Sequence, residues 1–168
     1  MKNVVLIGMP GAGKSTIGVV LAKVLGYQFV DADLVIQKRE GKLLRQIIAQ
    51  QGEEAFIQIE GEANKSITGP EVVIATGGSV VYHKEAMEQY QRDDLIVYIQ
   101  LSYETVAHRL SNLKRRGVVL KEGQTLKDLY EERVPLYENY AHITVNAEGL
   151  GVEELMDEIA RQIQQYHK

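Results

Sequence analysis

Eight residues near the start of the chain form a phosphate-binding pattern. They read Gly8-Met9-Pro10-Gly11-Ala12-Gly13-Lys14-Ser15, which satisfies the spacing G-x-x-x-x-G-K-[ST] in full. Glycines in such a loop let backbone N–H groups turn inward around a phosphate, where side chains would obstruct them. The lysine supplies a point charge, and the next hydroxyl can coordinate Mg²⁺. The pattern predicts a nucleoside triphosphate site whose residues are Gly11, Ala12, Gly13, Lys14, Ser15 and Thr16.

The alternative for this segment is a tight glycine turn that carries Lys-Ser by chance. Its position argues against that alternative. A continuous apolar run at 4–7 predicts a buried strand before it, and apolar residues at helical spacing in 17–25 predict a helix after it. The loop alone does not name a reaction, because GTPases, ATPases and small-molecule kinases share it.

Two further segments follow predicted strands. Asp31 and Asp33 come directly after residues 28–30. One carboxylate could hold a water on Mg²⁺ while the other takes a proton from an attacking hydroxyl. Alternatively, both could simply form a turn and cap the next helix. The turn Thr76–Ser79 follows residues 72–75 and would place unobstructed backbone at the same crevice, unless it is an ordinary glycine turn.

The elements that must position these residues alternate along the chain. Strands are predicted at 4–7, 28–30, 72–75, 95–99 and 143–145, and helices include 102–113, 125–140 and 152–164. This alternation predicts an α/β fold with a parallel sheet of about five strands, covered on both faces by helices. Ligands in such folds bind beyond the carboxyl ends of the strands. Residues 34–61 are helical and polar, and 114–124 form a basic, turn-like segment that we expect to be mobile.

Composition limits the class of protein. The 168 residues correspond to one domain. The net charge of −4 disfavours nucleic acid or an anionic membrane as the main partner. The absence of cysteine excludes disulfides and thiolate chemistry. The sequence shows neither a signal peptide nor an apolar run of the ~20 residues that a membrane helix needs, so we expect a cytoplasmic protein, working as a monomer.

Together these motifs resemble those of the shikimate kinase family, from residue 1 to about 163. The resemblance rests on the phosphate loop, the Asp-x-Asp pair, the stretch from Gly52-Glu53 through Phe56 to Glu60, the Thr76–Gly78 turn, an arginine-rich segment, and Arg133-Val-Pro-Leu-Tyr137, in the same order. It implies a P-loop NTPase fold of the nucleoside monophosphate kinase type, a three-layer α/β/α core with a substrate-binding arm at about 34–61 and a lid at about 112–124.

The resemblance also implies roles for individual residues. The phosphate loop, with Lys14 and Ser15, would hold ATP and Mg²⁺, and Asp31 would reach the metal through water. Asp33 would bind the acceptor and help to deprotonate the attacking hydroxyl. Arg116 would meet the transferring phosphate from the lid, with Arg109 beside the adenine. Arg133 would pair with the carboxylate of the acceptor, shikimate, near Gly78. The alternatives are a solvated basic face for Arg109 and Arg116, and a surface ion pair for Arg133.

Three positions depart from the family pattern. The family carries arginine directly after the phenylalanine, to grip the substrate carboxylate, but this chain has Ile57. Losing one charge-assisted contact costs on the order of 1.5–3 kcal/mol. Ser79 replaces the third glycine of a triplet, and Gly117 follows the lid arginine where proline is usual.

These departures leave three alternatives to a shikimate kinase open. A kinase of the same type could phosphorylate a different small hydroxylated metabolite. A nucleoside monophosphate kinase is a second possibility, although the arm offers no evident pair of arginines for a second phosphate. The third is a switch protein that binds ATP without transferring phosphate.

Overall fold

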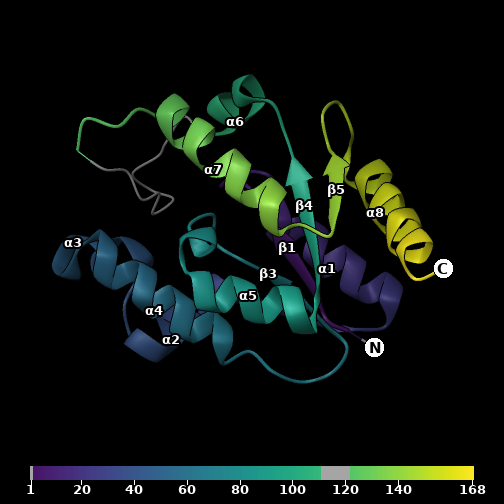
Figure 1. Ribbon diagram of the computed structural model, residues 1–168, viewed down its shortest axis with the longest axis horizontal. Coiled ribbons are helices and arrows are strands. Elements are labelled where there is room, and N and C mark those ends of the chain that lie inside the picture. The colour runs from purple at the N-terminus through teal and green to yellow at the C-terminus, as the bar shows by residue number, and fades with distance from the viewer. Residues whose placement is uncertain (1, 111–121) are drawn as a thin grey trace.

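The computed structural model describes residues 2–110 and 122–168 (Figure 1). Its centre is a sheet of five parallel strands in the order β2-β3-β1-β4-β5. The strands are β1 (Val4–Ile7), β2 (Gln28–Asp31), β3 (Val72–Ala75), β4 (Leu95–Gln100) and β5 (Ile143–Asn146). All five predicted strands and their parallel pairing are therefore confirmed.

Helices cover both faces of the sheet, as the alternation predicted. On one face lie α1 (Lys14–Leu25) and α8 (Val152–Tyr166), and on the other α5 (Lys84–Asp93), α6 (Tyr103–Arg109) and α7 (Leu126–Tyr140) (Figure 1). Of the helix predicted at 102–113, α6 covers Tyr103–Arg109; Leu110 leaves the helical conformation and is buried, and residues 111–113 lie outside the described part of the chain. None of the described helices combines the length and the apolar character needed to cross a bilayer.

Residues 34–61 fold into helices, as predicted. These are α2 (Ala32–Glu40), α3 (Leu44–Gln51) and α4 (Glu53–Lys65), and α4 packs against α5 and the short 3₁₀ helix η1 (Val80–Tyr82). The three helices share a small apolar core that is separate from the main core around the sheet; it is formed by Ile36, Leu44, Ile47, Phe56 and Ala63. This second core sets α4 in place beside the ends of the strands.

The strands at the centre of the sheet are buried along their whole length. Every residue of β1 and β3 is inaccessible, which explains their continuous apolar sequences. The edge strand β5 alternates instead between buried and exposed residues. The carboxyl ends of β1, β2 and β3 lie side by side, so the loops that follow them come together, as the parallel topology requires.

Candidate active site

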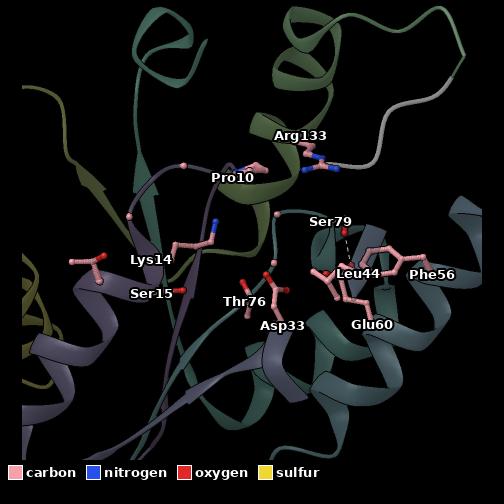
Figure 2. A pocket seen from close by; sticks show the side chains of 15 residues that line it. Pro10, Lys14, Ser15, Asp33, Leu44, Phe56, Glu60, Thr76, Ser79 and Arg133 are labelled. Atoms are coloured by element: carbon pink, nitrogen blue, oxygen red, sulfur yellow. Dashed lines mark hydrogen bonds between the residues drawn. The ribbon is translucent and has the colours of Figure 1, made fainter. Parts of the chain in front are cut away.

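A cavity of about 320 Å³ opens at the carboxyl ends of β1, β2 and β3 (Figure 2). It joins segments that are far apart in the sequence: the phosphate loop, the start of α2, the turn after β3, and residues of α3, α4 and α7. Its lining residues are Pro10, Gly11, Gly13, Lys14, Ser15, Thr16, Asp33, Leu44, Phe56, Glu60, Thr76, Gly77, Gly78, Ser79 and Arg133.

The phosphate loop leads directly into α1. Gly13 precedes this helix with φ of 90°, a left-handed conformation that favours glycine. The Lys14 ammonium is buried and donates hydrogen bonds to the backbone oxygens of Gly8 (2.6 Å) and Met9 (2.9 Å). Burial lowers its pKa to about 8. Arg109 lies across the loop, where its Nη1 donates to the oxygen of Gly11 at 3.1 Å.

The Asp31 carboxylate caps α2 and also contacts Ser15, so it combines the two roles that the sequence left as alternatives. Its Oδ1 accepts from the N–H of Asp33 at 2.9 Å, which caps α2, and its Oδ2 accepts from the Ser15 hydroxyl at 3.0 Å. A hydroxyl and a carboxylate side by side are oxygen donors of the kind that Mg²⁺ prefers, with phosphates and waters as its other ligands. Ser15 and Asp31 therefore fit the metal proposed for them.

Asp33 projects into the cavity from the first turn of α2 (Figure 2). Its Oδ1 is inaccessible to solvent and has no hydrogen-bond partner among residues 2–110 and 122–168. Burial, reinforced by the nearby Asp31 carboxylate, raises its pKa to about 6. A Cβ at Gly77 would lie 2.8 Å from this oxygen, so the turn after β3 needs glycine there.

Arg133 reaches the cavity from α7 and is only 1% exposed. The surface ion pair considered from the sequence is therefore wrong. Its Nε donates to the Tyr82 hydroxyl at 3.3 Å, and the guanidinium lies 5.3 Å from the centre of that ring. A Cβ at Gly78 would come within 2.8 Å of Arg133 Nη1. The glycine turn therefore lies directly against the guanidinium.

Two polar residues line the cavity without having been predicted as site residues. Glu60 of α4 is 1% exposed, and its Oε1 accepts from the Ser79 hydroxyl at 2.5 Å. Burial raises the pKa of Glu60 to about 7. A sequence signal existed, because Glu60 lies one helical turn after the buried Phe56 on the apolar face of α4.

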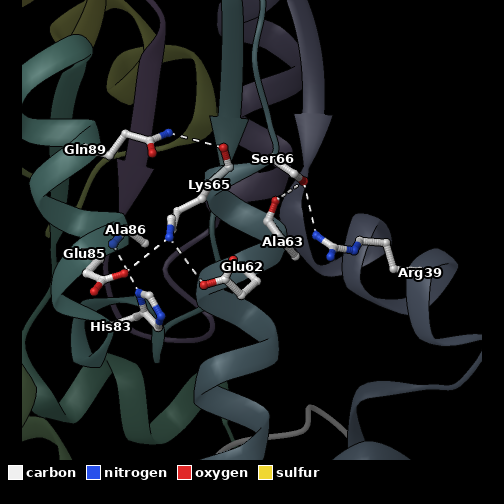
Figure 3. A network of polar contacts seen from close by, with 9 residues as sticks. All are labelled: Arg39, Glu62, Ala63, Lys65, Ser66, His83, Glu85, Ala86 and Gln89. Atoms are coloured by element: carbon white, nitrogen blue, oxygen red, sulfur yellow. Dashed lines mark hydrogen bonds and ion pairs between the residues drawn. The ribbon is translucent and has the colours of Figure 1, made fainter.

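Polar contacts fix the end of α4 that follows Glu60 (Figure 3). Lys65 pairs with Glu62 of its own helix and with Glu85 of α5, at 3.4 and 3.3 Å. Ser66 accepts from Arg39 of α2 at 3.3 Å. These contacts connect the end of α4 to α2 and α5 at the surface of the protein.

Two positions singled out from the sequence, Ile57 and Arg116, are not among the described residues that line this cavity. Ile57 does not line this cavity; it borders a second one, next to Tyr82 and Glu132. No cation therefore comes from position 57. Arg116 and most of the segment 112–124 predicted as a lid lie outside the described residues.

The parallel sheet, the phosphate loop leading into α1, and a carboxylate facing a buried arginine in one cavity define a P-loop small-molecule kinase. A family model described as shikimate kinase matches residues 10–164. A shikimate kinase of Thermodesulfovibrio yellowstonii is 39% identical over 165 residues, which is 96% of this chain and 95% of that one. The chain belongs to the shikimate kinase family.

Solved structures of shikimate kinases have the same fold as this chain. The shikimate kinase of Acinetobacter baumannii in complex with shikimate superposes with a TM-score of 0.91 at 30% identity, covering 98% of this chain and 94% of that chain. The shikimate kinase of Aquifex aeolicus gives a TM-score of 0.85 at 33% identity, covering 96% of each chain. The chain therefore shares its fold with these enzymes along nearly its whole length.

Proposed function

We propose that this protein transfers the γ-phosphoryl group of ATP to a hydroxyl of shikimate and forms 3-phosphoshikimate. The observation that carries the proposal is the joining of Lys14, Asp33 and buried Arg133 in one cavity. A phosphate site, a base and a guanidinium are what phosphorylation of a hydroxy acid requires. The complex of the Acinetobacter relative with shikimate supports the choice of acid.

Each group has a defined task in this reaction. The phosphate loop from Gly11 to Thr16 holds ATP, with Arg109 beside it. Arg133 and the backbone of Gly78 anchor the acceptor carboxylate, which places a hydroxyl beside Asp33. Asp33 accepts the proton of that hydroxyl as it attacks. The Lys14 ammonium exchanges the backbone oxygens of Gly8 and Met9 for the β- and γ-phosphates, where it offsets developing charge.

The metal belongs to the same proposal. Ser15 would hold Mg²⁺ and Asp31 would reach it through water. The chemistry that the metal would supply there is neutralisation of the phosphate charge. Removing Mg²⁺ with a chelator is expected to abolish turnover.

The remaining parts of the chain complete the enzyme. Residues 1–168 form one kinase unit, in which 34–61 act as the substrate-binding arm and 112–124 as a lid that brings Arg116 to the transferring phosphate. We infer a monomer that works in the cytoplasm, where its ATP is available. Nucleic acid and membranes are not its partners.

The test is ADP release with Mg²⁺-ATP, measured with and without shikimate, and mass spectrometry of the product. A shikimate-dependent rate together with a product one phosphate heavier supports the proposal. A rate that shikimate does not stimulate, with ATP binding intact, overturns it. AMP, CMP and UMP serve as control acceptors, because turnover of any of them would indicate a nucleoside monophosphate kinase. ATP hydrolysis that no acceptor increases would indicate a switch protein.

Ile57 favours one second candidate, a kinase of the same type with a different hydroxylated acceptor. The position that carries an arginine in the family is apolar here and faces away from the main cavity. An acceptor without a carboxylate would not need that arginine. A panel of hydroxy acids and amino alcohols, run in the same assay, separates this candidate from shikimate.

A further inference from the structure

Glu60 is a buried acid that the proposed mechanism does not use. It lines the main cavity, and one of its oxygens, Oε1, is occupied by the Ser79 hydroxyl. The other oxygen, Oε2, is buried and has no hydrogen-bond partner in the described part of the chain. An unpaired buried carboxyl oxygen is costly, so its presence in a cavity suggests a ligand that completes it.

Glu60 Oε2 and the Oδ1 atom of Asp33, the proposed base, both lie next to Gly77. A Cβ at Gly77 would lie 2.6 Å from Glu60 Oε2 and 2.8 Å from Asp33 Oδ1. The neighbouring Gly78 lies against Arg133 in the same way. Three side chains of the cavity lining thus lie against two consecutive glycines.

In the described part of the chain Glu60 forms no salt bridge, and the Lys14 ammonium bonds to backbone oxygens of its own loop. Ile57, one turn earlier on α4, is apolar and borders the other cavity. Glu60 is therefore held by a neutral hydroxyl, that of Ser79.

The charged groups around Glu60 come from three helices. These are Lys14 of α1, Asp33 of α2 and Arg133 of α7, while α3 contributes the apolar Leu44. The titratable phenols nearby are Tyr90 of α5 and Tyr137 of α7, and the His83 ring packs over Gly61, the next residue. Burial and the Asp33 carboxylate favour the neutral acid, which raises the pKa of Glu60 to about 7 against the opposing effects of Ser79, Arg133 and Lys14.

We propose that Glu60, held by Ser79, binds the acceptor as a neutral carboxylic acid that donates a hydrogen bond from Oε2. Because Oε1 accepts from Ser79, the proton of the neutral acid lies on Oε2, which lies against Gly77 in the cavity lining. The acceptor must then present an oxygen with a free lone pair to it. Through this contact α4 supplies a hydrogen-bond donor to the acceptor, which the apolar Ile57 of the same helix does not. An ionised Glu60 would instead repel a carboxylate acceptor. The inference rests on the proposed function, and Ser79 is a positioning residue in it.

The first test is the KM for shikimate at saturating Mg²⁺-ATP from pH 6 to pH 9. Wild-type KM is expected to rise about tenfold for each pH unit above the Glu60 midpoint, because one proton must be present for binding. Glu60→Gln keeps a donor at every pH, so its KM is expected to stay near the low-pH wild-type value. A flat wild-type profile, or a Glu60→Gln profile that still rises like that of wild type, would overturn the proposal.

Ser79→Ala tests the positioning role. The Ser79 hydroxyl stabilises ionised Glu60, so its removal is expected to move the midpoint of the KM profile to higher pH. A merely structural role would change KM equally at all pH values. Calorimetric binding of Mg²⁺-ADP, expected to be unchanged, shows that each variant is folded.

Infrared spectroscopy of the wild-type protein separates this inference from the choice of acceptor. A buried carboxylic acid band that wild type has and Glu60→Gln lacks is expected at pH 6, fading as the pH rises and shifting when an acceptor binds; the comparison removes the contribution of Asp33, whose pKa is about 6. Its absence at pH 6 would refute the neutral Glu60 even if shikimate is phosphorylated. If shikimate is not phosphorylated, the acceptor is wrong, and the band still decides the state of Glu60.

Discussion

Among the described residues, the lysine, arginine and glutamate side chains that the fold buries are gathered around one cavity. Lys14, Glu60 and Arg133 are each less than a tenth exposed, and Asp33 has a buried oxygen beside them. Burying charge costs free energy that the hydrogen bonds around it repay only in part. The burial fixes these groups in position before a substrate binds.

Lys14→Ala is expected to lower turnover about a hundred- to a thousandfold, because the site loses a preorganised charge on the phosphates. Steady-state ADP release measures the loss, and circular dichroism checks the fold. Lys23→Ala is the matched control, because Lys23 is exposed on the same helix and makes no contact with the cavity. Full turnover in Lys14→Ala would contradict the assignment of the phosphate loop.

Asp33 is expected to set the acid limb of the pH profile. Its pKa is raised from 3.8 to about 6, so the base is protonated below that pH and ionised above it. The value of kcat/KM should therefore fall as the pH drops below about 6. Asp33→Asn should remove both this limb and most of the activity. An acid limb that survives in Asp33→Asn would assign it to another group.

At the scale of elements, α4 carries Glu60 between two packed surfaces. One side lies on the small core formed with α2 and α3, and the other lies on η1 and α5. Gly61 makes the second contact possible, because the His83 ring occupies the space where its Cβ would be. The approach of α5 to α4 thus depends on one glycine.

Gly61→Ala is expected to destabilise the protein by about 1–3 kcal/mol, because the added methyl overpacks against His83. In an unhindered helix the same change would be stabilising. Urea unfolding measures the difference. In a His83→Ser background, where serine can still cap α5, Gly61→Ala should lose its cost. An equal cost in both backgrounds would exclude His83 as its cause.

For the whole molecule, the buried carboxyls make stability depend on pH. The pKa of Glu60 is raised from 4.5 to about 7 in the folded protein, so the folded state holds a proton that the unfolded state releases. The stabilisation from this proton is complete below the unfolded pKa and is lost as the pH rises through about 7. Asp33 acts in the same direction between its own two values.

The free energy of unfolding is therefore expected to fall by on the order of 2 to 3 kcal/mol between pH 4.5 and pH 8 on account of Glu60 alone. Urea unfolding at a series of pH values measures it. Glu60→Gln should flatten this part of the curve, and Glu62→Gln, an exposed change on the same helix, should leave it as in wild type. A wild-type curve that rises with pH in this range would contradict a neutral buried Glu60.

The sequence alone determined the class of fold and the phosphate site. Both depend on local patterns: apolar runs of strand length, helical spacing, and a loop motif whose residues are contiguous. Asp31 and Asp33 could be placed near that loop because parallel strands end at one edge of a sheet. The family was also evident, since its motifs occur in order along the chain.

Only the tertiary structure decided how the acceptor side is built. It excluded the surface ion pair that was the alternative for Arg133 by burying this side chain against Gly78, and it placed Ile57 at a second cavity. It also joined Ser79 to Glu60, which lies nineteen residues earlier in the chain. Pairings of this kind depend on how α4 and α7 pack around the glycine turn. Burial and long-range packing decide whether a carboxyl there is charged or neutral, and no local pattern records them.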